Sequence, residues 1–321
     1  MKINIFYKNI KKPWGGGNQF LDYLKNKFKK NKLYCNHDNA DVIIFNSHHN
    51  ISHLLNLKYK YQDTKKFIHR IDGPISNYRK NGNKIDKFIF IINKYLADAT
   101  VFQSRYSMKK TLLLTKINNP RKVIYNEANE NFFFPKKKRK TQIKDKIKLL
   151  SVSWSDNILK GFDFLDYLDK NLDFIKYEMD FIGNSPIKFK NINMYPPLQS
   201  KQLAKRMRES DIFIFPSIYE ACSNTLLEAM RCGTPVIVNN SSSNKEIFNG
   251  NGSLFTRKEQ LIEKISKINL SNLKYSRNNL LNILPVEQAY LQYIKKIFKR
   301  KKLSFLNYII LKIYVFFLFK K

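Results

Sequence analysis

The stretch Asp211–Val238, with the sequence DIFIFPSIYEACSNTLLEAMRCGTPVIV, decides the fold of this chain of 321 residues. Its apolar run Ile212–Phe215 predicts a buried strand, which Pro216 ends. A helix is expected from about Ser223 through Met230, and the run PVIV after it predicts a second strand. This order of strand, loop, helix and strand is typical of a parallel sheet covered by helices.

Two glutamates lie eight positions apart in this stretch, Glu220 on the predicted loop and Glu228 on the predicted helix. A carboxylate accepts hydrogen bonds, which suits the hydroxyl groups of a sugar. The backbone amides of Ser223, Asn224 and Thr225 begin the helix, where unpaired N–H groups and partial positive charge favour a phosphate. We therefore expect a sugar-nucleotide site here. The alternative is two solvated glutamates beside an amphipathic helix.

These features resemble the signature of the retaining glycosyltransferases of family four (glycosyl transferases of group one), in which two glutamates are separated by seven residues. The matching residues are Glu220, Leu226, Leu227, Glu228, Ala229, Met230, Gly233, Pro235, Val236 and Ile237. The resemblance extends over roughly residues 1 to 298. It implies the GT-B fold, an α/β architecture in which two Rossmann-like domains face a cleft, with the acceptor mostly on the first domain and the donor mostly on the second.

The resemblance also assigns roles to individual residues. Glu228 is expected to bind the ribose of a nucleotide sugar, and Glu220 to face the donor sugar as a catalytic residue. The amides of Ser223, Asn224 and Thr225 would hold the diphosphate. Enzymes of this fold generally bind their donors without a metal, so we expect neither a metal nor another cofactor.

A lysine–glycine pair, Lys160 and Gly161, follows the first predicted strand of the second half, where the family places a similar motif. A lysine ammonium is a compact charge suited to a diphosphate, so we expect Lys160 to bind the donor. Relatives often add an arginine a few residues earlier, but the window 151–159 contains no basic residue. The loop 241–246, SSSNKE, also departs from the paired glycines of many relatives.

The first half of the chain contributes two further candidates. Gly16 and Gly17 belong to a triple glycine before a helix expected from position 18, and relatives place a similar glycine loop against the donor. Asp72 follows a predicted strand in the motif HRIDGP, which directs it toward the cleft of a doubly wound sheet. We expect Asp72 to act on the acceptor side as a second catalytic residue. His69 is a candidate for contact with the donor sugar, and a plain structural turn is the alternative for this motif.

Strand and helix patterns alternate in two series and predict two α/β domains in tandem. Besides the two strands above, the expected strands are INIFY near the start, Asp41–Phe45, Lys66–Arg70, Ala99–Gln103, Ile147–Ser153 and Tyr177–Gly183. A basic stretch, residues 136–146, is expected to link the domains. We predict an acceptor domain over residues 1–140, a donor domain over 141–282, a helix that crosses back to the first domain within 283–300, and a tail over 301–321.

The tail combines basic and apolar segments. A basic cluster at 295–302 precedes the apolar segment Leu303–Phe319, which as a helix would reach about 25 Å, slightly short of a usual membrane span. Ser304, Tyr308 and Lys312 recur every four residues and leave an apolar remainder, a pattern typical of a helix in the membrane interface. The basic cluster adds attraction to anionic lipid. Docking against the protein's own body is the alternative.

Composition narrows the partners and the compartment. With 59 basic and 25 acidic residues the formal net charge is +34, which implies nucleic acid, an anionic membrane or phosphorylated small molecules as partners, or a compositional bias toward lysine. No nucleic-acid-binding motif is found, so nucleic acid is not the expected partner. Three cysteines without C-x-x-C spacing and the lack of a secretory signal predict a cytoplasmic protein. His48, His49 and His53 lack the further ligands of a metal site.

Together these patterns predict a retaining glycosyltransferase that moves a sugar from a nucleotide-sugar donor to a saccharide or lipid-linked acceptor in polysaccharide or glycolipid synthesis. It would work at the cytoplasmic face of a membrane, held there peripherally by its tail. Two alternatives remain open at this level: a GT-B-type epimerase or hydrolase of sugar nucleotides, and a basic nucleic-acid-binding protein.

Overall fold

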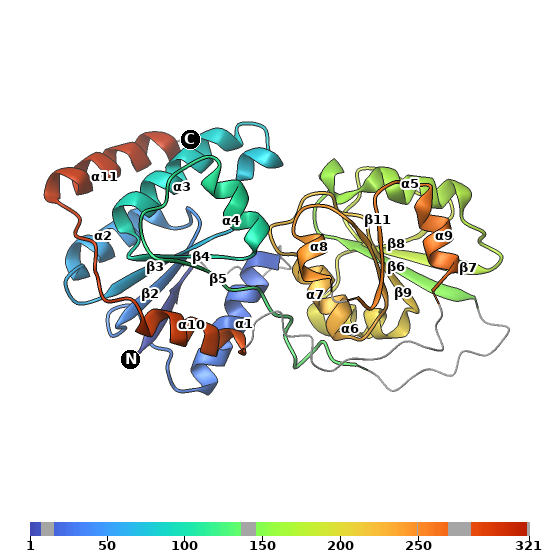
Figure 1. Cartoon of the computed structure of the whole chain (residues 1–321), viewed down its shortest axis with the longest axis horizontal. Helices are drawn as coiled ribbons and strands as arrows, with labels where there is room; N and C mark the ends of the chain where they lie inside the picture. The colour runs from blue at the N-terminus through green and yellow to red at the C-terminus, as the bar shows by residue number, and fades with distance from the viewer. Residues whose placement is uncertain (8–15, 136–145, 249, 269–283, 320–321) are drawn as a thin grey trace. The chain divides into compact units, whose positions relative to one another are not determined.

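The computed structural model describes residues 1–7, 16–135, 146–248, 250–268 and 284–319, shown in Figure 1. The chain forms two compact units. Unit 1 comprises Met1–Ile10, Leu21–Tyr125 and Asn282–Lys321, and unit 2 comprises Lys11–Phe20 and Asn126–Leu281. Most of the basic stretch expected to link two domains, residues 136–145, lies outside the described residues.

Unit 1 contains a five-stranded parallel sheet in the order β1-β2-β3-β4-β5. Its strands are β1 (Ile3–Phe6), β2 (Val42–Asn46), β3 (Lys66–Ile71), β4 (Ala99–Phe102) and β5 (Arg121–Val123). After β1 the chain returns to one side of this strand, where Tyr34 forms a parallel bridge with Ile3. It then crosses to the opposite side of β1 and forms β2 there. The winding direction therefore reverses between β1 and β2, which makes the sheet doubly wound.

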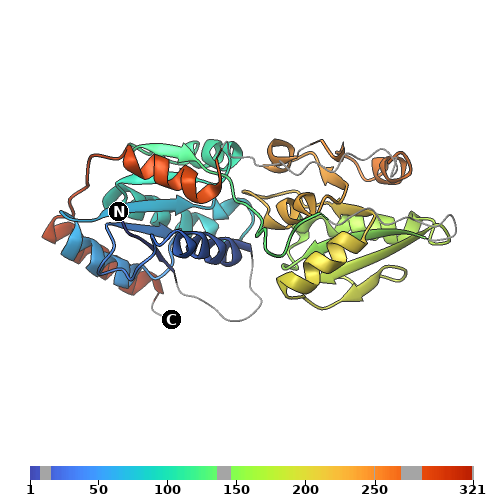
Figure 2. The ribbon, with the colours of Figure 1, turned by 90° about the horizontal axis from the view of Figure 1, so that it is seen from below.

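Helices cover both faces of this sheet. They are α1 (Gly16–Lys30), α2 (Ile51–Tyr61), α3 (Gly82–Leu96), α4 (Arg105–Leu112) and α10 (Val286–Lys295). In Figure 1, α2, α3 and α4 lie on one face, and α1 and α10 lie on the other, which is turned toward the viewer in Figure 2. The strands β1 to β4 are buried on both sides and consist largely of apolar residues, as expected for a parallel sheet between helices, whereas the edge strand β5 is partly exposed.

The last helix, α11 (Phe305–Phe319), packs on α2. Leu303, Leu311 and Val315 are buried there with residues of α2 and α3 such as Leu54 and Phe88. The chain leading into α11 is also fixed, because the Lys301 amide donates a hydrogen bond to Asp98. Within the described part of the chain, no helix is both long enough and apolar enough to cross a membrane.

Unit 2 contains a six-stranded parallel sheet in the order β11-β10-β9-β6-β7-β8. Its strands are β6 (Ile147–Ser153), β7 (Tyr177–Gly183), β8 (Asn193–Tyr195), β9 (Ile212–Phe215), β10 (Val236–Asn239) and β11 (Gly252–Phe255). From β6 the chain builds outward to β7 and β8, then returns to the other side of β6 for β9 and continues to β10 and β11. The neighbours β6 and β9, paired at Leu149 and Ile212, thus mark the point where the winding direction reverses.

The helices of unit 2 also form two layers. They are α5 (Phe162–Asn171), α6 (Ser200–Glu209), α7 (Asn224–Arg231), α8 (Asn244–Ile247) and α9 (Gln260–Ser266). Helices α5 and α9 lie on one face of the sheet, where their apolar side chains share a core with the strands, and α6 and α7 lie on the other (Figure 1). In such sheets ligands bind outside the carboxyl ends of the strands where the winding reverses. The loops after β6 and β9 occupy that position.

Candidate functional site

The loop after β6 is held against the loop after β9. A short 3-10 turn, Ile158–Lys160, is capped by Asn157, whose side-chain oxygen accepts a hydrogen bond of 2.9 Å from the Leu159 amide. The Leu159 carbonyl accepts a hydrogen bond of 2.8 Å from the Ile218 amide. Gly161 adopts φ of +82°, and a Cβ atom there would lie 2.3 Å from the Pro216 carbonyl oxygen. Only glycine therefore allows the two loops to approach this closely.

This approach brings Lys160 and Glu220 together. The Lys160 ammonium lies 2.7 Å from a carboxylate oxygen of Glu220, and the Ser217 hydroxyl donates a hydrogen bond of 2.7 Å to the same oxygen. The side chains of Lys160 and Glu220 are 29% and 14% exposed to solvent. The Glu220 amide donates a hydrogen bond of 3.0 Å to the Ser242 hydroxyl. Two residues that the sequence predicts separately as site residues therefore form one cluster at the β6–β9 reversal.

The amino terminus of α7 follows directly from this cluster. Ser223 is the N-cap, and its hydroxyl accepts a hydrogen bond of 3.2 Å from the Leu226 amide. The Asn224 side-chain oxygen accepts a hydrogen bond of 2.8 Å from the Asn126 side chain. Thr225, at the second position of the helix, is half-buried. The helix begins where the sequence predicts it, with amide groups directed at the loop that carries Glu220.

Glu228 lies one turn further along α7 and is buried. Among the residues that the structure describes, none donates a hydrogen bond to its carboxylate. Burial raises the pKa of Glu228 to about 8, because removal from water penalises the charged form. A buried carboxyl group at the proposed nucleotide site is a hydrogen-bond acceptor suited to ligand hydroxyls.

Asp72 lies in unit 1, directly after β3, and has several partners within the protein. The guanidinium of the buried Arg70 donates a hydrogen bond of 2.6 Å to one carboxylate oxygen of Asp72, and the side chain of Gln103 donates to the same oxygen. The Asn46 side chain donates a hydrogen bond of 3.0 Å to the other oxygen. With 33% of its side chain exposed, Asp72 is the counter-ion of a buried arginine at the carboxyl edge of the sheet. Its role toward an acceptor stays a prediction.

His69 belongs to the core of unit 1. Its ring is fully buried and stacks on Phe45 with 4.4 Å between the ring centres. One ring nitrogen lies 2.9 Å from the Ser47 carbonyl oxygen, and the other lies 3.1 Å from the Asn93 side-chain amide. Burial lowers the pKa of His69 to about 4, so the ring is neutral. Both of its nitrogens are occupied by the fold, which favours the structural interpretation of this histidine.

The glycine loop differs from its expected form. Helix α1 begins at Gly16, so Gly16 and Gly17 form its first turn and do not precede it as a loop. Their donor-binding role stays a prediction. A Cβ atom at Gly17 would meet nothing within 4 Å, and the residue before them, Gly15, lies outside the described residues.

Three residues that build the cluster in unit 2 carry no signal in the sequence. Ser217 and Ser242 bind Glu220, and Asn126 binds the side chain of Asn224. Serine and asparagine are common in loops for many reasons, so only the spatial arrangement distinguishes them. As for metals, no three histidine, cysteine, aspartate or glutamate side chains in the described ranges lie close enough together to hold an ion.

Comparison with known proteins places this site in context. Residues 188–280, which include the Glu220–Glu228 stretch, match the family model of glycosyl transferases group 1. An uncharacterised 41.2 kDa protein in the cps region of Klebsiella pneumoniae is 29% identical over 184 residues, which cover 54% of this chain and 51% of that protein. The match thus spans about half the length of this curated relative.

The whole chain is similar in structure to solved glycosyltransferases. The structure of Anabaena HepE in complex with UDP and glucose matches with a TM-score of 0.62 at 14% identity, covering 98% of this chain and 99% of that one. Sucrose-phosphate synthase from Thermosynechococcus elongatus matches with a TM-score of 0.56 at 14% identity, covering 95% and 79%. The predicted GT-B fold with two Rossmann-like domains is confirmed, and the family match supports the glycosyltransferases of group 1.

Proposed function

We propose that this chain is a retaining glycosyltransferase that transfers a sugar from a nucleotide-sugar donor to a saccharide or lipid-linked acceptor. The observation that carries the proposal is the cluster at the β6–β9 reversal. There Lys160 pairs with Glu220, the amino terminus of α7 begins three residues later in the chain, and the buried Glu228 follows on that helix. Cation, helix amides and carboxylates are the groups that a nucleoside diphosphate sugar requires. The HepE structure with UDP and glucose favours a donor of this class.

Each group has a distinct task in the proposed reaction. Glu228 accepts hydrogen bonds from the ribose hydroxyls, and the α7 amides hold the diphosphate. The Lys160 ammonium, now paired with Glu220 at 2.7 Å, turns to the diphosphate when the donor binds, which frees Glu220 to face the sugar. Positioned charge of this kind stabilises a leaving group as its negative charge grows.

The transfer itself then requires no protein nucleophile. The bond between the anomeric carbon and the donor phosphate oxygen breaks while the acceptor hydroxyl oxygen bonds to the same carbon on the same face. The acceptor proton passes to the departing phosphate oxygen. The protein contributes alignment and charge stabilisation. We propose that this works without a metal, so a chelator leaves the rate unchanged.

The proposed setting is the cytoplasmic face of a membrane, where the chain contributes to polysaccharide synthesis. The relative from a cps region supports the pathway. The exposed apolar residues of α11 and the basic residues before it support peripheral attachment to anionic lipid. Co-sedimentation with anionic and neutral vesicles tests this attachment, and equal binding to both would contradict the electrostatic part.

A ligand screen tests the donor site. We expect one class of nucleoside diphosphate sugar to raise the melting temperature of the protein, and Glu228→Ala to abolish that shift. Glu209→Ala is the matched control, because Glu209 is a half-buried glutamate of unit 2 paired only loosely with Lys205 at 3.9 Å. No shift with any nucleotide sugar, for a folded protein, would contradict the proposal.

Product analysis separates the alternatives. Release of the sugar without an acceptor would indicate a hydrolase, and isomerisation of the sugar nucleotide would indicate an epimerase. Sugar transfer that occurs only when an acceptor is present would indicate a transferase. Binding to nucleic acid that falls steeply with salt and survives Glu228→Ala would favour the nucleic-acid alternative.

A further inference from the structure

Helix α11 packs on the protein through the buried Leu311 and Val315, forms polar contacts with α2 beside them, and leaves a further set of apolar side chains exposed. The Tyr308 hydroxyl and the Lys312 ammonium lie 2.8 Å and 3.0 Å from the side-chain oxygen of Asn56 on α2. The large side chains on the other face are exposed, among them Phe316 at 55% and Phe317 at 70%. This exposed face consists of Phe305, Leu306, Ile309, Ile310, Ile313, Phe316 and Phe317. Such an apolar surface marks an interaction site.

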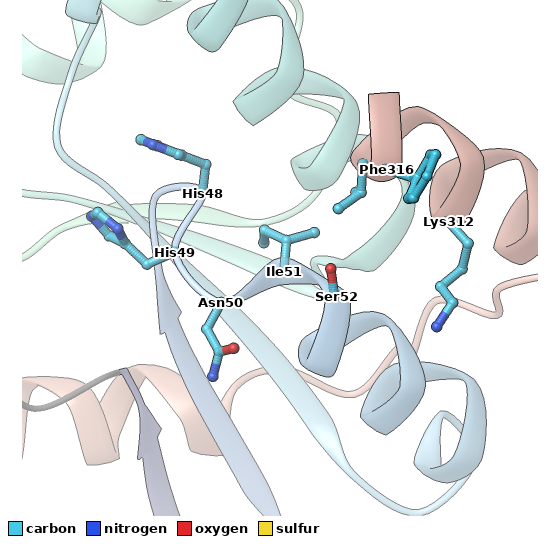
Figure 3. A pocket seen from close by; sticks show the side chains of 8 residues that line it. His48, His49, Asn50, Ile51, Ser52, Lys312 and Phe316 are labelled. Atoms are coloured by element: carbon cyan, nitrogen blue, oxygen red, sulfur yellow. The ribbon is translucent and has the colours of Figure 1, made fainter. Parts of the chain in front are cut away.

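A pocket of about 720 Å³ lies in unit 1 between α11 and the start of α2. Figure 3 shows Lys312 and Phe316 extending from α11 on one side, and the segment from His48 to Ser52 on the other. Its apolar lining comes from Ile51, Val315 and Phe316. Its polar lining consists of His48, His49, Asn50, Ser52 and Lys312. These eight lining residues include no carboxylate and one ammonium, so the pocket favours a ligand that combines an anionic group with an apolar group.

The pocket also lies at the ligand-binding edge of its sheet. The segment from His48 to Ser52 follows β2, and β1 and β2 mark the reversal of winding in unit 1. Ligands bind outside the carboxyl ends of strands at such a reversal. Asn46, the last residue of β2, donates a hydrogen bond of 3.0 Å to Asp72, the predicted acceptor-side residue. Pocket and Asp72 thus belong to the same edge.

We infer that this pocket binds the phosphate end of a lipid-linked acceptor, whose hydrocarbon chain continues along the exposed apolar face of α11. The inference rests on the proposed function and specifies its acceptor. The Lys312 ammonium has three hydrogen-bond donors, so it contacts a phosphate while keeping its bond to Asn56. The basic residues before α11 and the net charge of +34 attract an anionic lipid to this part of unit 1.

The direct test uses dodecyl phosphate as a probe, below its micelle concentration, with the full chain and calorimetry. Dodecanol and inorganic phosphate are the two partial probes. We expect dodecyl phosphate to bind and the partial probes to bind at least about tenfold more weakly, since each lacks one half of the recognised ligand. Equal binding of inorganic phosphate would indicate a free-phosphate site and overturn the inference.

Two pairs of variants locate the binding. Ser52→Trp fills the pocket from an exposed position, and Thr64→Trp places the same ring at an exposed site that does not line it. Lys312→Gln removes the ammonium of the pocket, and Lys299→Gln removes an exposed charge of the basic cluster at 295–302, which does not line it. We expect the first member of each pair to weaken dodecyl phosphate binding by about tenfold or more and the control to change it less than about twofold. Equal losses within either pair would overturn the inference.

Two further measurements distinguish a failure of this acceptor site from a failure of the donor site. Nucleotide-sugar binding to unit 2 is measured on the same variants, and we expect it to be unchanged. A protein that binds the donor but not dodecyl phosphate contradicts the inference alone, whereas one that binds dodecyl phosphate but no nucleotide sugar contradicts the proposed function. A stable dimer in light scattering, combined with no dodecyl phosphate binding, would overturn the inference and assign the exposed face of α11 to a second copy.

Discussion

The two units contain candidate site carboxyl groups in opposite states. In unit 1, Asp72 accepts hydrogen bonds from Arg70, Asn46 and Gln103. In unit 2, Glu228 is buried, and none of the described residues donates a hydrogen bond to it. Asp72 therefore completes the fold, whereas burial of Glu228 costs stability. A cost of this kind is typical of residues kept for a ligand.

The Glu220 carboxylate is intermediate between the fully hydrogen-bonded Asp72 and Glu228, which has no such partner in the part of the chain that the structure describes. Its carboxylate has partners, Lys160 and Ser217, but the ion pair is partly exposed and joins two loops. Such a pair can be exchanged for a ligand at little cost, because a partly exposed ion pair contributes only about 0–1 kcal/mol. The three carboxylates thus range from fully satisfied to unsatisfied, and mutations at each should differ in kind.

The largest effect on stability is expected at Asp72. Asp72→Ala removes the counter-ion of the buried Arg70 and should reduce the free energy of unfolding by about 3 kcal/mol, the lower limit for a broken buried ion pair, because Asp72 itself is 33% exposed. Urea denaturation measures this value. Asp63→Ala is the control, because the Asp63–Lys302 ion pair is exposed and should contribute at most about 1 kcal/mol. Equal losses for the two variants would show that Asp72 is not structural and would favour a direct role toward the acceptor.

The next effect concerns catalysis and not stability. Lys160→Gln should reduce the rate of sugar transfer by about 10²–10³, because it removes a charge aimed at the leaving diphosphate. Its free energy of unfolding should change by less than about 1 kcal/mol. Lys170→Gln is the control, since Lys170 forms an exposed ion pair with Asp166 on the same unit. If Lys160→Gln lowered the transfer rate only because less of the protein was folded, Lys160 would be a structural residue like Asp72, and this prediction would be wrong.

A smaller effect is expected at Glu228. Glu228→Gln retains the size of the side chain but replaces one acceptor oxygen by an amide donor. Above pH 8, where the carboxyl group is ionised, it should weaken nucleotide binding by about 1.5–3 kcal/mol, the contribution of hydrogen bonds to a charged group. Titration calorimetry of Glu228→Gln and the control Glu209→Gln gives the comparison. Unchanged affinity in Glu228→Gln would show that this carboxylate is not the ribose acceptor.

The sequence predicts the interior strands of both sheets and the edge strand β1 (Ile3–Phe6), but it misses the other three edge strands. Apolar runs such as Val42–Asn46 and Ile212–Phe215 are buried on both faces, so hydrophobicity alone identifies them. The missed strands are all at sheet edges and only three or four residues long: β5 (Arg121–Val123), β8 (Asn193–Tyr195) and β11 (Gly252–Phe255). Each of these three strands has one neighbour in its sheet and partly exposed residues, so it carries little apolar signal.

The site residues could be predicted individually, but not their contacts. Lys160 and Glu220 are 60 positions apart and meet because β9 pairs with β6 and not with β8, its predecessor in the chain. A list of strands does not determine this order. Likewise, the polar stripe of α11 is evident in the sequence, but only the contacts of Tyr308 and Lys312 with Asn56 show that the stripe faces the protein.

The smallest expected effect is the pH dependence of stability at Glu228. Burial raises its pKa to about 8 from an ordinary value of about 4.5, so between these values the folded state binds the proton more strongly than the unfolded state. The contribution of this group to stability is therefore complete below about pH 4.5 and is lost as pH rises through about 8. Relative to the wild type, Glu228→Gln should therefore become progressively more stable as pH rises from 5 to 8. Nucleotide binding should strengthen over the same range, because only the ionised form accepts bonds from both ribose hydroxyls. Parallel stability curves for the two proteins would mean that Glu228 is ionised and satisfied, like Asp72, and the contrast between the two units would disappear.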